Sequence, residues 1–217
     1  MRWVCTTGLV ALVGAVLAAA DDKAKTFNFG KGDVGKVPAG WKAAQTGKGM
    51  SVWKVVEDKT APSKSGFALA QTAESPSAVF NLCVAEETSF KDVEVSVAFK
   101  ANAGKRDQGG GVVWRYQDAN NYYIARMNPL EDNFRVYKVV AGRRSPEFQN
   151  AEVKVPAGEW HTLKVRMAGG HIECFLDDKK HLDVKDDTFT RPGKVGLWTK
   201  ADAQSSFDNF QVRDLAR

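Results

Sequence analysis

Three arginines in the middle of the chain lie in segments where polar and apolar side chains alternate, which is the period of a β-strand. If the apolar side chains face a core, the arginines and their polar neighbours share the opposite face. This outward set consists of Arg115, Tyr122, Arg126, Asn128, Arg135 and Tyr137. Strands joined by hairpins are usually neighbours, so the three arginines are expected side by side. Guanidinium groups donate hydrogen bonds to hydroxyls and carboxylates, and aromatic rings cover the apolar face of a sugar ring. The set therefore predicts a saccharide site, and its positive charge favours an acidic saccharide.

The same alternation also fits a solvated sheet face, because antiparallel sheets commonly carry charges on the side away from the core. Glu94 faces outward by the same rule and would pair with one of the arginines. Trp198 falls outside the apolar set of its own segment, on the side of Lys194 and Lys200. It would serve either as a sugar platform at the margin of the site or as a plug at the end of the core. The residues leave both choices open.

Carboxylates that could act as a catalytic pair are few. The Glu-x-Asp-x-x-Glu strand pattern, which aims an acid and a nucleophile into one cleft about 5 Å apart, does not occur. Asp107, Glu131 and Asp132 remain as candidates in neighbouring loops, although Glu131 and Asp132 also suit a solvated turn. We therefore expect a binding protein rather than an enzyme. A glycoside hydrolase that uses these carboxylates and a non-catalytic adhesion or scaffolding domain are the alternatives.

The elements that must position these residues are strands. From Thr26 onward, short apolar alternations are separated by Gly, Pro, Asn and Asp, and no amphipathic run of helical length lies between them. This pattern excludes βαβ units and predicts an all-β sandwich of two antiparallel sheets. The expected strands are residues 67–71, 78–84, 93–100, 111–116, 122–128, 134–140, 160–167, 171–176, 194–199 and 207–212.

Four short strings in this region carry a family resemblance. Residues 108–118 read QGGGVVWRYQD, residues 120–123 read NNYY, and residues 193–199 read GKVGLWT, followed by FDNF at 207–210. These strings resemble the concanavalin A-like lectin/glucanase superfamily, which includes laminin-G-like domains, family 16 glycoside hydrolases and bacterial 3-keto-disaccharide hydrolase-like domains. The resemblance covers about residues 27–212. It implies a jelly-roll sandwich whose concave outer sheet face carries the ligand.

Related sandwiches often hold calcium in a loop near one end. The resemblance makes Asp208 a candidate calcium ligand, while an ion pair with a lysine of a neighbouring strand is its alternative role. His161, His171 and His181 are ten residues apart, which matches no common metal-ligand spacing. We therefore expect no cofactor, with calcium at Asp208 as the one alternative.

The N-terminal segment predicts export. Arg2 precedes an apolar stretch over residues 9–17 and a run of three alanines. That is the pattern of a signal peptide, residues 1–20, cleaved before Asp21, with a retained anchor as the alternative. We expect residues 21–217 to form one secreted or periplasmic jelly-roll domain that does not insert into a membrane.

The charge distribution limits the possible partners, and the cysteine positions predict the state of the thiols. The 31 basic and 26 acidic residues are mixed along the chain without a basic run, so nucleic-acid binding is not expected. We expect a monomer whose partner is a saccharide. Cys83 and Cys174 are expected to be free buried thiols, because alternation points Cys174 inward but places Cys83 on the other face of its strand. A disulfide between them is the alternative.

Overall fold

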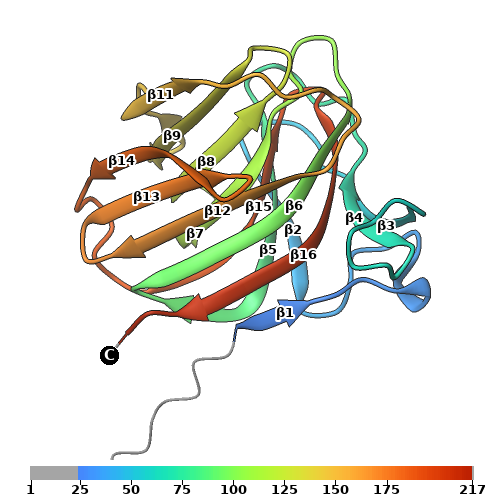
Figure 1. Cartoon of the computed structure of the whole chain (residues 1–217), viewed down its shortest axis with the longest axis horizontal. Helices are drawn as coiled ribbons and strands as arrows, with labels where there is room; N and C mark the ends of the chain where they lie inside the picture. The colour runs from blue at the N-terminus through green and yellow to red at the C-terminus, as the bar shows by residue number, and fades with distance from the viewer. Residues whose placement is uncertain (1–23, 217) are drawn as a thin grey trace, which may run out of the picture.

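The computed structural model describes residues 24–216, which form two antiparallel β-sheets packed face to face (Figure 1). Sheet A contains β1 (Lys25–Phe27), β3 (Trp53–Glu57), β4 (Phe67–Gln71), β6 (Val93–Ala103), β12 (His161–Ala168), β13 (His171–Leu176), β14 (Lys179–Lys185) and β16 (Gln204–Asp214). Sheet B contains β2 (Trp41–Thr46), β5 (Phe80–Phe90), β7 (Gly110–Asp118), β8 (Asn121–Asn128), β9 (Asn133–Val140), β10 (Arg143–Arg144), β11 (Gln149–Glu152) and β15 (Gly193–Lys200). Within the described residues the one helical element is a 3-10 turn, η1 (Lys31–Asp33).

The strand order confirms the prediction of an all-β jelly-roll sandwich. Sheet A runs β14-β13-β12-β6-β16-β4-β3 with β1 beside β16, and sheet B runs β10-β9-β8-β7-β15-β5-β2 with β11 beside β9. Each segment expected to be a strand overlaps an observed one. The strands that the sequence missed, β1, β2, β3, β10, β11 and β14, lie at a sheet edge or beside the main path. No helix in residues 24–216 is long and apolar enough to cross a membrane, and the predicted signal peptide lies outside the described residues.

The main core lies between the sheets and is built by the side chains that alternate inward from each strand. Trp114, Tyr123 and Met127 come from sheet B, and Phe99 and Phe207 come from sheet A. All five are fully buried. The apolar side chains that alternate with the outward set were expected to face the core. This is confirmed for Val112, Trp114, Tyr123, Ala125, Met127, Phe134 and Val136.

A second apolar cluster, here called the outer cluster, covers the middle of the outer face of sheet B. Its members alternate with core residues along their strands. They are Phe80, Leu82, Val84, Val113, Tyr122, Ile124, Val139 and Trp198. None of them is more than 8% exposed. The middle of sheet B is therefore apolar on both faces.

The two cysteines of the described chain are free and buried, as predicted. The reason given for Cys83 is wrong, because Cys83 belongs to the main core while Leu82 and Val84 face outward. Alternation could not choose between the faces of β5, since both are apolar. Burial raises the pKa of both thiols, which keeps them protonated and unreactive.

Candidate functional site

Strand register lines up one row of residues across the outer face of sheet B. Trp198 of β15 is the register partner of Gly111 of β7, which is also the partner of Arg126 of β8. Arg126 is in turn the partner of Arg135 of β9. The prediction that Arg126 and Arg135 lie side by side on this face is confirmed. Gly111 adds no side chain between the tryptophan and the arginines.

Arg115 does not join this row, so the prediction of three adjacent arginines is wrong. The backbone of Arg115 takes a φ of 44°, and the register of β7 with β8 shifts between Trp114 and Asp118. This β-bulge redirects the side chain. The guanidinium donates hydrogen bonds to the carbonyl oxygens of Lys91, Gly169 and Phe189 and to the carboxylate of Asp92. The side chain is 1% exposed, so Arg115 supports the fold.

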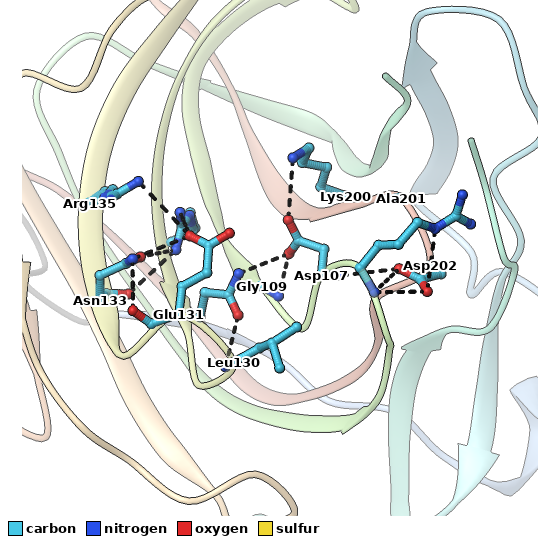
Figure 2. Close-up of polar contacts among 12 residues, drawn as sticks. Asp107, Gly109, Leu130, Glu131, Asn133, Arg135, Lys200, Ala201 and Asp202 are labelled. Carbon is cyan, nitrogen blue, oxygen red and sulfur yellow. Dashed lines mark hydrogen bonds and ion pairs between the residues drawn. The ribbon is translucent and has the colours of Figure 1, made fainter. Parts of the chain in front are cut away.

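Arg126 lies near the end of β8 and contacts a group of polar side chains. Figure 2 labels Glu131, Asn133 and Arg135 of this group. The guanidinium of Arg126 donates to the Glu131 carboxylate at 2.9 Å and to the side-chain oxygen of Asn133. It also lies 5.9 Å from the centre of the Tyr137 ring. Arg135 approaches the same Glu131 oxygen at 3.9 Å. One carboxylate therefore already pairs with both arginines of the row.

Asp107 closes the other side of this group, in the loop before β7. Its carboxylate accepts hydrogen bonds from the backbone N–H of Gly109 at 2.7 Å and from Asn128 Nδ2 at 3.2 Å. It also lies 3.5 Å from the ammonium group of Lys200. Figure 2 shows Asp107 between Lys200 and the β8–β9 turn that carries Glu131. We define the polar cluster as Asp107, Arg126, Asn128, Glu131, Asn133, Arg135 and Lys200.

Asp202, between β15 and β16, fixes the loop that carries Asp107. Its carboxylate accepts hydrogen bonds from the backbone N–H groups of Lys105, Arg106 and Asp107, at 3.0 to 3.2 Å. Burial raises the pKa of Asp202, but these hydrogen bonds stabilise the charged form and leave the pKa lowered. The position of Asp107 thus depends on a residue 95 positions away in the chain.

The two carboxyl groups of the polar cluster have pKa values shifted in opposite directions. Burial raises the pKa of Asp107, and this effect outweighs the hydrogen bond from Gly109 and the charge of Arg126. Burial also raises the pKa of Glu131, but Arg126 and Asn133 more than reverse this and leave it lowered. One carboxyl group therefore holds a proton more readily, and the other stays ionised. Such divergence is how neighbouring carboxyl groups take acid and base roles.

Exposure divides the polar cluster into a buried part and an accessible part. The side chains of Arg126 and Asp107 are each 3% exposed, whereas those of Glu131, Arg135 and Lys200 are 37%, 28% and 26% exposed. A ligand that approaches from solvent meets the second group first. The buried residues hold the accessible ones in place.

The aromatic residues predicted to line the site lie on the expected face but are buried. Tyr122, Tyr137 and Trp198 are at most 1% exposed. The Tyr122 hydroxyl forms a hydrogen bond of 2.7 Å with the hydroxyl of Thr46, and the Trp198 ring packs 5.4 Å from the ring of Phe80. Trp198 therefore presents no open ring face and does not form the sugar platform considered from the sequence.

Two acidic residues lie outside the polar cluster. Asp132 is an exposed residue of the β8–β9 turn with a φ of 49°, so its position is that of a turn former. Glu94 lies on β6 of sheet A, where its register partners are Arg166 and Arg213. The prediction that Glu94 pairs with an arginine of the saccharide site is wrong. Alternation assigns a residue to a face but does not say which sheet holds the strand.

The donor set around Asp208 does not fit calcium. Its side chain is fully buried, and one carboxylate oxygen accepts a hydrogen bond from the backbone N–H of Ser63 at 2.7 Å. Calcium takes six or more oxygen ligands, yet among the described residues the one group of three potential metal-ligating side chains is His171, Glu173 and Asp183. Lys180 already forms ion pairs with Glu173 and Asp183. The lysine partner considered for Asp208 is not found within the described chain either.

Sequence reasoning missed four residues that shape the polar cluster, namely Gly109, Asn133, Lys200 and Asp202. Gly109 had a signal in the three successive glycines that follow Asp107 and Gln108. A Cβ on Gly109 would lie 2.8 Å from Asp107 Oδ1 and 3.5 Å from Arg126 Cδ, so a side chain there would crowd the polar cluster. Alternation placed Lys200 on the side of Trp198, but nothing local in the sequence indicated the pairing of Lys200 with Asp107 or the role of Asp202.

The fold is thus an antiparallel jelly-roll β-sandwich with a cluster of polar side chains on the outer face of one sheet. The chain belongs to the family of 3-keto-alpha-glucoside-1,2-lyase-like domains, whose model matches residues 23–213. This confirms the resemblance to the 3-keto-disaccharide hydrolase-like domains. None of the curated proteins matches the sequence.

Several solved structures share the fold. The carbohydrate-binding module CBM66 from Bacillus subtilis has a TM-score of 0.62 and 20% identity, with 81% of this chain and 96% of that chain covered. The exoplasmic/lumenal domain of VIP36, in its Ca2+/Man-bound form, has a TM-score of 0.57 and 14% identity, with 88% and 90% covered. A putative glycosyl hydrolase from Parabacteroides distasonis has a TM-score of 0.51 and 16% identity, with 82% and 89% covered. At these identities the likeness is one of fold.

Proposed function

We propose that this protein binds a saccharide at the polar cluster. The observation that carries the proposal is an accessible carboxylate, ammonium and guanidinium, from Glu131, Lys200 and Arg135, held in place by buried partners. Sugar hydroxyls both donate and accept hydrogen bonds, so fixed groups of both kinds suit them. Two structures of the same fold support the proposal, since one is a carbohydrate-binding module and the other is a Man-bound form.

A neutral saccharide fits the polar cluster better than an acidic one. The acidic preference expected from the sequence rested on three arginines on one face, with Glu94 as the one carboxylate considered as their partner. Glu131 instead pairs with Arg126 and Arg135, and Asp107 lies beside Lys200. An acidic sugar would therefore compete with Glu131 and Asp107 for cationic groups that these carboxylates already contact.

Glycan-array screening followed by calorimetric titration of the strongest binder tests this proposal. We expect Glu131→Gln to weaken that binding about tenfold, because a charged acceptor is replaced by a neutral amide. Glu94→Gln is the matched control, since Glu94 lies on β6 of the opposite sheet. Binding of no glycan by the wild type, or equal affinity of Glu131→Gln and wild type, would contradict the proposal.

A second candidate function is cleavage of a 3-keto-glycoside, in keeping with the family to which the chain belongs. The specific observation is the opposed pKa shifts of Asp107 and Glu131. In an elimination, ionised Glu131 would remove the proton from the carbon between the ketone and the anomeric carbon. That electron pair forms a carbon–carbon double bond as the anomeric bond to the leaving oxygen breaks, and Asp107 would protonate the leaving oxygen.

This second candidate is tested with methyl 3-keto-α-glucoside, by following the ultraviolet absorbance of an unsaturated ketone product. Asp107→Asn and Glu131→Gln should each abolish turnover, and the wild-type rate should show a bell-shaped pH dependence. Absence of product with the wild type, while saccharide binding is retained, would leave binding as the function.

We further propose that the protein is exported, on the basis of the signal-peptide pattern in residues 1–20. N-terminal sequencing of the protein from its native host should begin at Asp21. An intact N-terminus at Met1 would contradict this.

A further inference from the structure

A hollow opens on the outer face of sheet B at the end of β7 away from the polar cluster. It has a volume of about 190 Å³. It adjoins a second hollow of about 450 Å³, with which it shares Glu86, Tyr116, Gln117 and Lys194. The smaller hollow is completed by Lys42, Ala44, Val84 and Asp118. No residue of the polar cluster lines either hollow.

Tyr116 lies in this hollow because of the bulge at Arg115. Alternation from Val112 and Trp114 predicts that Tyr116 points into the main core. Trp114 does so, but Tyr116 packs on the outer cluster, with its ring 5.9 Å from the ring of Tyr122. The left-handed backbone of Arg115 changes the face on which the following residue lies. The ring of Tyr116 remains partly exposed.

The surrounding structure holds this bulge in place. A non-glycine residue in the left-handed region costs about 1–3 kcal/mol and persists where its neighbours support it. The four hydrogen bonds of the Arg115 guanidinium supply part of that support. Gln117 Nε2 adds hydrogen bonds to the carbonyl oxygens of Arg115 and Pro192. A Cβ on Gly193 would lie 2.5 Å from the Arg115 carbonyl carbon, so the bulge also requires glycine there.

We infer that the Tyr116 hollow is a second saccharide subsite, in which a sugar ring stacks on the Tyr116 side chain. Ala44 and Val84 extend the apolar floor beside the ring, and the polar rim carries both hydrogen-bond donors and acceptors. A pyranose ring has the matching character, apolar on its faces and polar around its edge. The inference rests on the proposed saccharide binding and specifies that the saccharide is an extended chain.

The spacing of the two sites sets the length of that chain. Gly111, which lies in the row of Arg126 and Arg135, is five residues from Tyr116 on β7, which corresponds to about 16 Å at about 3.3 Å per residue. A disaccharide is too short to contact both the polar cluster and Tyr116. An oligosaccharide of several units can do so if it crosses the surface above the buried outer cluster.

Calorimetric titration with malto-, cello-, laminari- and mannohexaose, and with the four matching disaccharides, tests the inference. We expect Tyr116→Ala to weaken hexasaccharide binding about tenfold and to leave disaccharide binding unchanged. Tyr116→Phe keeps the ring and should bind like the wild type. Glu131→Gln should weaken both ligand lengths, because it acts at the polar cluster. Thermal unfolding of each variant establishes that it is folded. Lys42→Ala, at an exposed position on the rim of the hollow, is a second variant that should weaken hexasaccharide binding with less effect on the fold.

The outcomes separate the two claims. If the wild type binds hexasaccharides and Tyr116→Ala and Lys42→Ala bind them equally well, the second subsite is wrong while the proposed function stands. If Tyr116→Ala weakens disaccharides and hexasaccharides alike, the two sites are not separate and the inference is also wrong. If the wild type binds none of the eight probes, both the inference and the proposed function fail for these sugars.

Discussion

The outer faces of the two sheets both carry ion pairs, but they differ in what surrounds the charges. On sheet A, the side chains of Arg166 and Lys180 pair with Glu173 and are 46% and 45% exposed. On sheet B, the side chain of Arg126 is 3% exposed and has four hydrogen bonds within the polar cluster and to Tyr137. Exposed pairs contribute little to stability, whereas buried charges require every partner. The outer face of sheet A is a solvated surface, whereas that of sheet B holds a partly buried cluster of paired charges.

Removing Arg126 is expected to lower the stability of the protein more than any other change considered below. Arg126→Met should lower the free energy of unfolding by about 2 kcal/mol, because buried acceptors such as Asn133 lose their donor. Arg166→Met on sheet A should change it by less than about 0.5 kcal/mol. Urea denaturation at pH 7 measures both. Similar losses for the two variants would show that the faces do not differ as described.

The next largest loss of stability is expected when Gly109 in the polar cluster is given a side chain. Gly109→Ala should lower the free energy of unfolding by about 1–2 kcal/mol, because the new methyl group would lie 2.8 Å from Asp107 Oδ1. Gly32→Ala is the control, since a Cβ there meets no atom within 4 Å. The same urea titrations report the outcome. An unchanged free energy of unfolding for Gly109→Ala would show that the polar cluster can accommodate a methyl group at this position.

A smaller effect is expected on the pH dependence of stability, which should differ between the outer faces of sheets A and B. The pKa of Asp107 is raised in the folded state, chiefly by burial, so its ionisation opposes folding as the pH rises above its ordinary value of 3.8. The pKa of Asp183 on sheet A is lowered by hydrogen bonds from Lys180 and His171, so its ionisation favours folding above that value and the benefit is lost as the pH falls. Relative to the wild type, Asp107→Asn should therefore gain stability from pH 3 to pH 7, whereas Asp183→Asn should lose it. The difference in urea midpoint between each variant and the wild type, plotted against pH, should have opposite slopes for the two variants. Slopes of the same sign would refute the assignment.

The smallest expected effect concerns charge selectivity at the polar cluster. Glu131→Gln leaves Arg126 and Arg135 without their shared carboxylate, so the ratio of acidic to neutral glycan affinity should rise about threefold at low salt. The gain should shrink at physiological salt, where the screening length is about 8 Å. Competition titrations with a carboxylated and an uncarboxylated glycan measure the ratio. A constant ratio at both salt concentrations would show that Glu131 does not set the charge preference.

Most of the fold followed from the sequence because burial imposes a period of two on each strand. The faces of Tyr122, Arg126, Asn128, Arg135 and Tyr137 were predicted for the same reason. Alternation gave wrong faces where a strand did not have one apolar and one polar face, or where a bulge interrupted it. β5 is apolar on both faces, which hid the orientation of Cys83, and the bulge at Arg115 interrupted the period of β7.

The polar cluster could be predicted only in part, because its partners come from distant segments. Register between neighbouring strands explains Arg126 beside Arg135. Nothing local in the sequence connects Asp202 with the backbone of residues 105–107, or Lys200 with Asp107. Glu131 was recognised as a turn residue, but its pairing with Arg126 depends on the conformation of the β8–β9 turn.

The hydrogen bonds of Arg115 also bear on how fast the protein folds and unfolds. The guanidinium reaches partners 23, 24, 54 and 74 residues away, so the loops that carry them must all be ordered before these bonds can form. The entropy of closing such long loops must be paid before these bonds form, so we expect the Arg115 hydrogen bonds to form after the rate-limiting barrier. Interactions absent from the transition state affect the unfolding rate rather than the folding rate. One buried arginine at the end of the sandwich is thus expected to prolong the lifetime of the native state without making the protein fold any faster.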